Sequence, residues 1–175
     1  IFELVYFARP DSFIDKISVY KTRSRMGRIL AERWRETGIP VDVVIPVPES
    51  SRPAATAMAA ELGVKYSEGL VKNRYIGRTF IMPGQQQRER SIRRKLNSIQ
   101  VEFEGKDVLI LDDSIVRGST SRQIVRMARE SGARRIYFLS YSAPLVSPCY
   151  YGIDMQTKSE FIAADHSVEE IAELT

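Results

Sequence analysis

Residues 108–121 read VLILDDSIVRGSTS, and this stretch gives the strongest indication of the fold. Four aliphatic residues run directly into two adjacent carboxylates, Asp112 and Asp113, and a loop with a glycine and several hydroxyl side chains follows. Ligands of parallel sheets bind beyond the carboxyl ends of the strands. A loop that leads into a helix offers free N–H groups to a phosphate. The stretch therefore predicts a buried strand, then a phosphate-binding loop, then a helix.

The two carboxylates are expected to make different contacts, because neighbouring strand residues point to opposite faces. They can reach two hydroxyls of one sugar, or one can reach the sugar and the other a magnesium ion. We expect both to lie at a solvent-facing strand end, with a phosphate in the loop 114–121. A Walker B strand also ends in an acid, but its companion G-x-x-x-x-G-K-[ST] is absent from the sequence. Two capping aspartates remain a structural alternative, which leaves the hydroxyl cluster unexplained.

The rest of the chain alternates between extended and helical patterns. We expect strands at 41–48, 64–73, 106–113 and 133–144, and helices at 18–37, 51–63 and 119–131. Ser51 is a possible N-cap of the second helix, and Ser167 with Glu170 predicts a capping box on a short helix within residues 166–174. This alternation predicts an α/β fold, with a mainly parallel central sheet flanked by helices on both faces.

The composition of the chain limits the kinds of partner that it is expected to bind. The 175 residues are enough for one domain, and no apolar run approaches the roughly 18–20 residues of a membrane span, so we expect no membrane partner. The net charge is +4, and much of the positive charge lies within 72–97, which favours a local anion site over a nucleic-acid face. The single cysteine, Cys149, favours a reducing, cytoplasmic location. Because the chain starts without Met, we expect it to be a piece of a longer protein.

The segment 74–97 breaks the alternation, since it is long, charged and rich in glutamine. A loop of this length in a compact domain is usually a lid, a binding loop or disordered. Its apolar residues favour a lid over disorder; they are Tyr75, Phe80, Ile81 and Met82. We expect this lid to be flexible without ligand and ordered with it, because its cations repel one another until an anion arrives.

Several of these motifs resemble a known family. VLILDDSIVRGST is similar to the phosphoribosyl pyrophosphate (PRPP) signature of type I phosphoribosyltransferases. Longer stretches resemble the glutamine PRPP amidotransferase family: YFARPDSFID (6–15), VIPVPESS (44–51), VKNRYIGRTFIMPGQQQRERSIRRKLN (71–97) and PCYYGID (148–154). The resemblance covers essentially the whole chain, and it implies a type I phosphoribosyltransferase fold over residues 1–175, with a flexible lid loop.

The resemblance also implies a reaction. In that family, ammonia attacks C1 of PRPP in a magnesium-dependent step with inversion, through an oxocarbenium-like state, giving 5-phosphoribosylamine and pyrophosphate. This is the first step of purine (IMP) synthesis. The ammonia comes from glutamine in a separate glutaminase domain, which we expect to lie outside this chain, as does a C-terminal tail. The resemblance further implies purine nucleotides as feedback inhibitors and a homo-oligomer for the full-length protein.

The resemblance assigns roles to two turns and to the lid. The turn Pro48, Glu49, Ser50 and Ser51 would bind pyrophosphate, with Ser50 helping to hold Mg²⁺ together with Asp112 and Asp113. The remaining PRPP-binding residues would be Ser114, Arg117, Gly118, Ser119, Thr120 and Ser121. In the lid, Arg78 and Lys95 are the expected catalytic cations, which meet the leaving pyrophosphate. Tyr75, Phe80 and Ile81 would wall a path for ammonia, with simple lid packing as an equal alternative.

Cys149 lies in PCYYGID, where cluster-bearing members of the family have a cysteine ligand of a [4Fe–4S] cluster. A cluster needs four thiolates, and this chain has one. The resemblance places one of the others just before Ile1 and two beyond Thr175. We therefore expect the parent protein to bind the cluster and this chain alone not to hold one. The alternative is a small, partly buried thiol.

Two other functions stay open. One is a PRPP-binding regulatory domain, which would need a DNA-binding segment that this sequence does not display. The other is a salvage phosphoribosyltransferase, which would need a base-stacking hood that residues 150–164 alone do not exclude. Retention of the lid with Arg78 and Lys95 favours the enzyme that uses ammonia.

Overall fold

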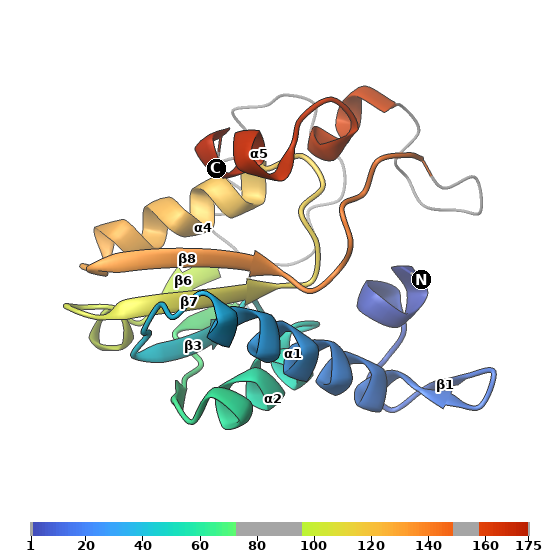
Figure 1. Ribbon diagram of the computed structural model, residues 1–175, viewed down its shortest axis with the longest axis horizontal. Coiled ribbons are helices and arrows are strands. Elements are labelled where there is room, and N and C mark those ends of the chain that lie inside the picture. The colour runs from blue at the N-terminus through green and yellow to red at the C-terminus, as the bar shows by residue number, and fades with distance from the viewer. Residues whose placement is uncertain (1, 73–95, 149–157, 175) are drawn as a thin grey trace.

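The computed structural model of the chain describes residues 2–72, 96–148 and 158–174 (Figure 1). Within these residues the central sheet has four parallel strands in the order β4–β3–β7–β8. They are β3 (Val43–Pro46), β4 (Lys65–Tyr66), β7 (Asp107–Asp112) and β8 (Arg135–Ser140). The predicted parallel sheet is confirmed.

Strand β7 runs through the middle of this sheet. Its register pairs Leu111 with Pro46 of β3 on one side, and Asp112 with Ser140 of β8 on the other. Every residue of β7 is buried, which explains its continuous aliphatic run, because a strand of a parallel sheet is covered on both faces. The carboxyl ends of β3, β7 and β8 therefore meet at one edge.

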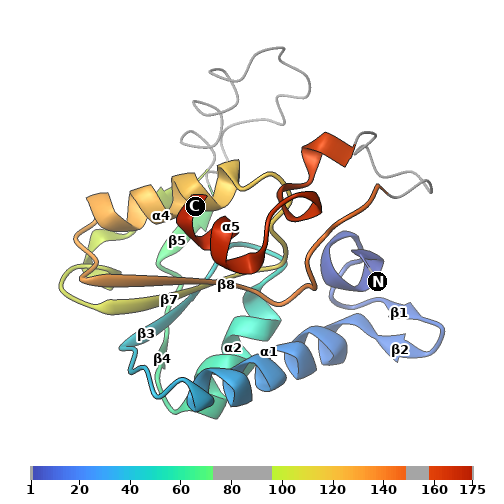
Figure 2. The ribbon, with the colours of Figure 1, turned by 45° about the horizontal axis from the view of Figure 1, so that its top comes forward.

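Helices cover both faces of the sheet, as predicted. Helices α1 (Val19–Glu36) and α2 (Arg52–Leu62) lie on one face, and α4 (Ser119–Glu130) lies on the other (Figures 1 and 2). Two buried apolar clusters correspond to these faces, one containing Trp34 and Met58 from α1 and α2, the other containing Ile124 from α4.

Helices α1 and α2 approach each other closely at Gly27. A Cβ atom at this position would lie 2.1 Å from the carbonyl oxygen of Ala54. Because that neighbour is backbone, it cannot turn aside as a side chain could. The glycine is thus required by the packing of the two helices on the same face of the sheet.

The predicted strand 64–73 is wrong in one respect, because it forms two strands in two sheets. After β4 the chain leaves β3, and β5 (Leu70–Lys72) pairs antiparallel with β6 (Leu96–Ser98). The change occurs at Gly69, where a Cβ atom would lie 2.6 Å from Cδ1 of Ile45. The sequence pattern was continuous, but the packing under Gly69 turns the chain away from the central sheet.

The remaining elements lie at the two ends of the chain and in one connection. A π-helical turn, η1 (Glu3–Phe7), precedes a hairpin formed by β1 (Phe13–Ile14) and β2 (Ile17–Ser18). The connection carries η2 (Gln100–Glu102), and the C-terminal part has η3 (Lys158–Glu160), η4 (Ile162–Ala164) and α5 (Val168–Leu174). Among the described residues, none of the helices combines the length and the apolar character of a membrane span.

The capping box on α5 is confirmed. The Ser167 hydroxyl accepts a hydrogen bond from the Glu170 amide at 3.2 Å, and the Glu170 carboxylate accepts one from the Ser167 amide at 2.7 Å. The predicted lid lies outside the described residues except for Leu96 and Asn97, which belong to β6. The expectations for residues 73–95, including Tyr75, Arg78, Phe80, Ile81 and Lys95, and for Cys149 therefore also fall outside them.

Candidate active site

Two turns lie side by side at the carboxyl edge of the sheet. One follows β3 and leads into α2 through residues 47–51, and the other follows β7 and leads into α4 through residues 113–118. They are neighbours because β3 and β7 are paired, and the pairing continues past the strand, where the Val47 amide donates to the Leu111 carbonyl at 2.8 Å. Both turns thus place a helix N-terminus at the same edge, as anion binding requires.

A hydrogen bond joins the two turns. The Ser50 hydroxyl, in the first turn, donates to the carboxylate of Asp113 in the second. The Ser114 hydroxyl donates to the other carboxylate oxygen of Asp113 at 2.6 Å. Ser50 and Asp113, predicted for one site from positions far apart in the sequence, are therefore in direct contact.

The expectation that Asp112 and Asp113 face solvent is wrong. Their exposed fractions are 7% and 6%. The cause is that β8 and the chain beyond it cover the strand end, with the Tyr141 amide donating to the Asp112 carbonyl at 3.2 Å and the Ser142 amide donating to the Asp113 carbonyl at 3.0 Å. The expected difference between the two carboxylates holds, since Asp113 contacts Ser50 and Ser114 while Asp112 lies beside Ser51.

Burial changes the acidity of both carboxylates. Burial raises the pKa of Asp112, and the negative charge of neighbouring Asp113 raises it further. Burial also raises the pKa of Asp113, against the opposing effects of the Ser114 and Ser50 hydroxyls and of the positive charge of Arg23. Burial thus disfavours the ionised form of both carboxylates. A bound cation would stabilise that ionised form.

Ser51 marks the start of α2, but its side chain does not cap the helix. Its backbone has φ −83° and ψ −10°, a helical conformation in which the hydroxyl does not reach the next turn's amides. The hydroxyl is instead buried beside the Asp112 carboxyl and favours the charged form of that group, although its position does not meet the geometry of a hydrogen bond to Asp112 or to any other described residue. A buried, unpartnered hydroxyl beside two acids indicates a place where a ligand supplies the missing partner.

The predicted phosphate loop ends at Gly118, which precedes α4 in the left-handed conformation, with φ 73°. Ser119 and Thr120 follow at the exposed first positions of α4, where their amides have no partner within the helix. Ser121 is buried, and its hydroxyl donates to the Gly118 carbonyl at 3.0 Å, so it shapes the turn. Arg117 forms an ion pair with Glu160 of η3.

The remaining predicted residues of the first turn differ in exposure. Pro48 is half-buried and Glu49 is exposed, and the peptide bond between them is cis. Neither residue makes a side-chain hydrogen bond to the Ser50–Asp113 pair within the described part of the chain. Their backbone therefore shapes the turn that Ser50 and Ser51 occupy.

Two residues beside the site were missed by sequence reasoning, Arg23 and Tyr141. Arg23 is 1% exposed, although it is a charged residue of an amphipathic helix. Its position was the available signal, since it lies four residues after Val19 and four before Gly27, on the buried face of α1. Tyr141 follows β8 directly and is 9% exposed.

The donor set suits a hard cation. The oxygen atoms of Ser50, Asp112 and Asp113 are the kind of ligand that Mg²⁺ prefers. Among the residues that the structure describes, no group of three or more His, Cys, Asp or Glu side chains could hold a metal by itself. Mg²⁺ usually binds through one or two carboxylates together with substrate phosphates, so these residues fit a metal that arrives with a diphosphate.

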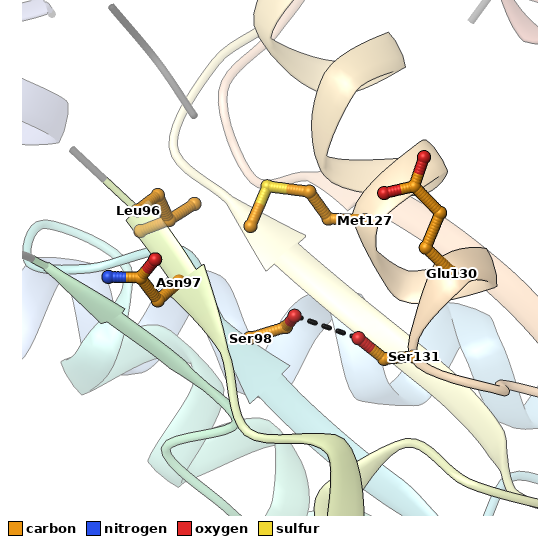
Figure 3. A pocket seen from close by; sticks show the side chains of 6 residues that line it. All are labelled: Leu96, Asn97, Ser98, Met127, Glu130 and Ser131. Carbon is orange, nitrogen blue, oxygen red and sulfur yellow. Dashed lines mark hydrogen bonds between the residues drawn. The ribbon is translucent and has the colours of Figure 1, made fainter. Parts of the chain in front are cut away.

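A separate cavity of about 360 Å³ lies between β6 and the C-terminal end of α4 (Figure 3). Its lining residues are Leu96, Asn97, Ser98, Met127, Glu130 and Ser131. The Ser131 hydroxyl donates to Ser98 across it at 2.7 Å. No predicted site residue lines this cavity, and it lies at the end of α4 opposite to the phosphate loop.

Comparison with known proteins agrees with this geometry. Residues 19–141 match the family model described as the phosphoribosyl transferase domain. The chain is 56% identical over 176 aligned residues to an amidophosphoribosyltransferase of Pseudomonas aeruginosa, covering 99% of this chain and 35% of that protein. The chain belongs to the phosphoribosyl transferase domain family, and its fold is the type I phosphoribosyltransferase fold.

Two solved structures are also similar. One, described as the allosteric regulatory enzyme of purine biosynthesis, has a TM-score of 0.84 at 49% identity, covering 98% of this chain and 36% of that one. The other, a glutamine PRPP amidotransferase from B. subtilis complexed with ADP and GMP, has a TM-score of 0.84 at 50% identity, covering 98% and 37%. The chain thus spans about a third of the length of the relatives it matches.

Proposed function

We propose that this chain is the phosphoribosyltransferase part of an amidophosphoribosyltransferase, which catalyses attack of ammonia on C1 of PRPP to give 5-phosphoribosylamine and pyrophosphate. The observation that carries the proposal is the hydrogen bond between Ser50 and Asp113, which brings two anion-binding turns together at one edge of the sheet. A substrate with a phosphate at one end and a diphosphate at the other matches two such turns. The similarity to amidophosphoribosyltransferases supports the choice of reaction.

In this proposal each turn binds one end of PRPP. The exposed amides and hydroxyls of Ser119 and Thr120 bind the 5-phosphate at the N-terminus of α4. The turn 48–51 binds the pyrophosphate at the start of α2, where the unpartnered Ser51 hydroxyl gains an acceptor. Asp112, the last residue of β7, and Asp113, the first residue of the second turn, accept hydrogen bonds from the ribose hydroxyls.

Mg²⁺ would be held by Ser50, Asp112 and Asp113 together with pyrophosphate oxygens. When bound, it neutralises the buried carboxylates and the charge that develops on the leaving pyrophosphate. The residues themselves orient the substrate. As the bond from C1 to the pyrophosphate oxygen breaks, the ammonia nitrogen bonds to the opposite face of C1, so catalysis rests on positioning and charge stabilisation.

The lid roles belong to the same proposal, although these residues lie outside the described part of the chain. Arg78 and Lys95 would supply positive charge to the leaving pyrophosphate, and lid closure would exclude water from the oxocarbenium-like state. Tyr75, Phe80 and Ile81 would line the path of the incoming ammonia. Each role rests on the sequence motif of residues 71–97.

The proposal extends to the whole protein. We propose that a glutaminase domain supplies the ammonia, that the full-length protein is a cytoplasmic homo-oligomer, and that purine nucleotides inhibit it, as the relative bound to ADP and GMP suggests. We also propose that Cys149 ligates a [4Fe–4S] cluster in that protein. Anaerobic purification followed by iron and sulfide analysis tests the cluster, and an active, iron-free enzyme would return Cys149 to a simple thiol.

The function is tested by measuring pyrophosphate release from PRPP and Mg²⁺ with ammonium as the nitrogen donor. We expect pyrophosphate release to depend on ammonium and to stop when Mg²⁺ is chelated. The same assay with each nucleobase separates the alternatives. Release that depends on a nucleobase would identify a salvage enzyme, and PRPP binding without any turnover would identify a regulatory domain.

A further inference from the structure

The N-terminal turn η1 is attached to the interior of the domain by Arg23. The guanidinium Nε donates to the Leu4 carbonyl at 2.9 Å, and Nη2 donates to the Ala8 carbonyl at 2.9 Å. Arg23 lies on α1, so it ties the start of the chain to a helix of the central fold. A buried guanidinium is costly unless it is hydrogen-bonded and balanced by charge, which indicates that these contacts are specific.

Tyr141 connects the same N-terminal turn to the active site. Its hydroxyl lies 2.9 Å from the Val5 carbonyl oxygen and 3.2 Å from the Ser50 carbonyl oxygen. A phenol has one proton, so the hydroxyl shares it between these two acceptors. The Tyr141 hydroxyl therefore links the turn that carries Ser50 to η1.

Electrostatic interactions also connect Arg23 and Tyr141 with Asp113. The positive charge of Arg23 favours the ionised forms of both Asp113 and Tyr141, so its guanidinium lies within electrostatic reach of each. Burial and the negative charge of Asp113 raise the pKa of Tyr141, so its hydroxyl stays protonated and remains a donor. Arg23, Asp113 and Tyr141 thus form one buried group behind the pyrophosphate turn.

We propose that Tyr141, with the N-terminal turn that Arg23 holds in place, is a positioning residue for the pyrophosphate half of the substrate site. The inference rests on the proposed function, because it assigns the turn 48–51 to pyrophosphate. The Tyr141 hydroxyl donates to the backbone of Ser50, and within the described part of the chain it makes no hydrogen bond to the turn that leads into α4. Its influence is therefore directed to one end of the substrate.

Because Tyr141 acts on one end of the substrate, the effect of Tyr141→Phe can be stated specifically. This variant removes the hydroxyl and keeps the ring. The variant loses the hydrogen bond to the Ser50 carbonyl, so the pyrophosphate turn is held less well. We expect KM for PRPP and the inhibition constant of magnesium pyrophosphate to rise roughly tenfold, the effect of about one buried hydrogen bond. The inhibition constant of ribose 5-phosphate should stay within about twofold, because its phosphate binds at the other turn.

The matched control is Tyr137→Phe. Tyr137 lies on β8, and its ring packs edge-on against Trp34 with the centroids 5.1 Å apart. Its hydroxyl makes no hydrogen bond to either active-site turn within the described part of the chain. The same chemical change four residues earlier, within β8, should leave all three constants unchanged.

A second variant, Arg23→Lys, keeps the positive charge but cannot offer two donors in the geometry of a guanidinium. We expect it to raise the pyrophosphate constant more than the ribose 5-phosphate constant, as Tyr141→Phe does. If it proves too unstable to assay, Tyr141→Phe decides the inference by itself, since loss of one hydroxyl leaves the core packing in place.

The constants are measured in the full-length protein with ammonium as the donor. A wild-type protein that neither binds nor turns over PRPP would overturn the proposed function. An active wild type with Tyr141→Phe indistinguishable from it would overturn the positioning role alone. An equal loss of affinity for pyrophosphate and ribose 5-phosphate would also overturn it, because that result indicates general loosening of the domain.

Discussion

The Ser50 hydroxyl donates a hydrogen bond to the carboxylate of Asp113, a residue 63 positions further along the chain. Each residue follows a different strand, and the bond forms because β3 and β7 are neighbours in register. Asp113 also accepts the Ser114 hydroxyl at 2.6 Å, so its carboxylate is held from both turns. The pair is therefore the point at which changes in one turn reach the other.

Ser50→Ala and Asp113→Asn are each expected to weaken magnesium-dependent PRPP binding by about ten- to a hundredfold, because each removes a charge-assisted hydrogen bond and a proposed metal ligand. The double variant should lose less than the product of the two effects, since both changes remove the same bond. Titration calorimetry with PRPP and Mg²⁺ measures the PRPP affinity of the wild type, the two single variants and the double variant.

Asp107→Asn is the matched control for this cycle. Asp107 lies at the opposite end of β7, where Nε of Arg134 donates to it at 2.7 Å. The substitution is the same and the strand is the same, so PRPP affinity should change by less than about twofold. Full additivity of Ser50→Ala and Asp113→Asn would show that the two residues act separately in binding.

Asp112→Asn is expected to stabilise the ligand-free protein at neutral pH. Burial and Asp113 raise the pKa of Asp112 in the folded state, so the folded protein binds a proton that the unfolded chain has released. Wild-type stability therefore falls as pH rises from the unfolded pKa, about 4, to the folded one, by about 1.4 kcal/mol for each unit of difference. The neutral amide avoids this loss, so the gain should vanish near pH 4 and below.

Thermal unfolding from pH 4 to pH 9, without Mg²⁺ or PRPP, measures this difference. Asp107→Asn should show the opposite sign, because Arg134 lowers the pKa of Asp107 and its charged form is the favoured one in the folded state. That contribution is present above the unfolded pKa and is lost as pH falls. A destabilised Asp112→Asn protein at pH 8 would contradict the inference that the buried charge is unfavourable without a cation.

Gly27→Ala is expected to lower the free energy of unfolding by about 3 kcal/mol or more, because the added methyl group meets the Ala54 carbonyl oxygen and forces α1 and α2 apart. Chemical denaturation measures the change. The neighbouring variant Arg28→Ala, at an exposed position of α1, should change stability by less than about 0.5 kcal/mol. Wild-type stability in Gly27→Ala would mean that the two helices separate at little cost.

Arg78→Ala and Lys95→Ala are expected to lower kcat by about a hundredfold, with a smaller effect on PRPP affinity, because both cations are proposed to act on the charge that develops as pyrophosphate leaves. Steady-state kinetics with ammonium as the donor separates kcat from KM. Arg33→Ala, which removes the same charge at an exposed position of α1, is the control. An equal fall in affinity with unchanged kcat would assign these residues to ground-state binding.

Local sequence patterns were sufficient for much of this protein. The sequence patterns predicted the parallel sheet and the edge at which Ser50, Asp112 and Asp113 gather. These patterns are the aliphatic run before Asp112, the hydroxyl-rich loop after Asp113 and the alternation of extended and helical segments. These features are local because strand and helix periodicities and turn chemistry depend on residues a few positions apart. The capping box at Ser167 was predicted for the same reason.

Packing between distant segments decided the rest. The burial of Asp112 and Asp113 depends on β8 and the chain beyond it, and the contact of Asp113 with Ser50 depends on the pairing of β3 with β7. The positions of Arg23 and Tyr141 behind the turn 48–51 follow from how η1, α1 and the end of β8 meet. Such contacts join residues without any shared period in the sequence, so only the folded chain brings their charges and hydroxyls into one site.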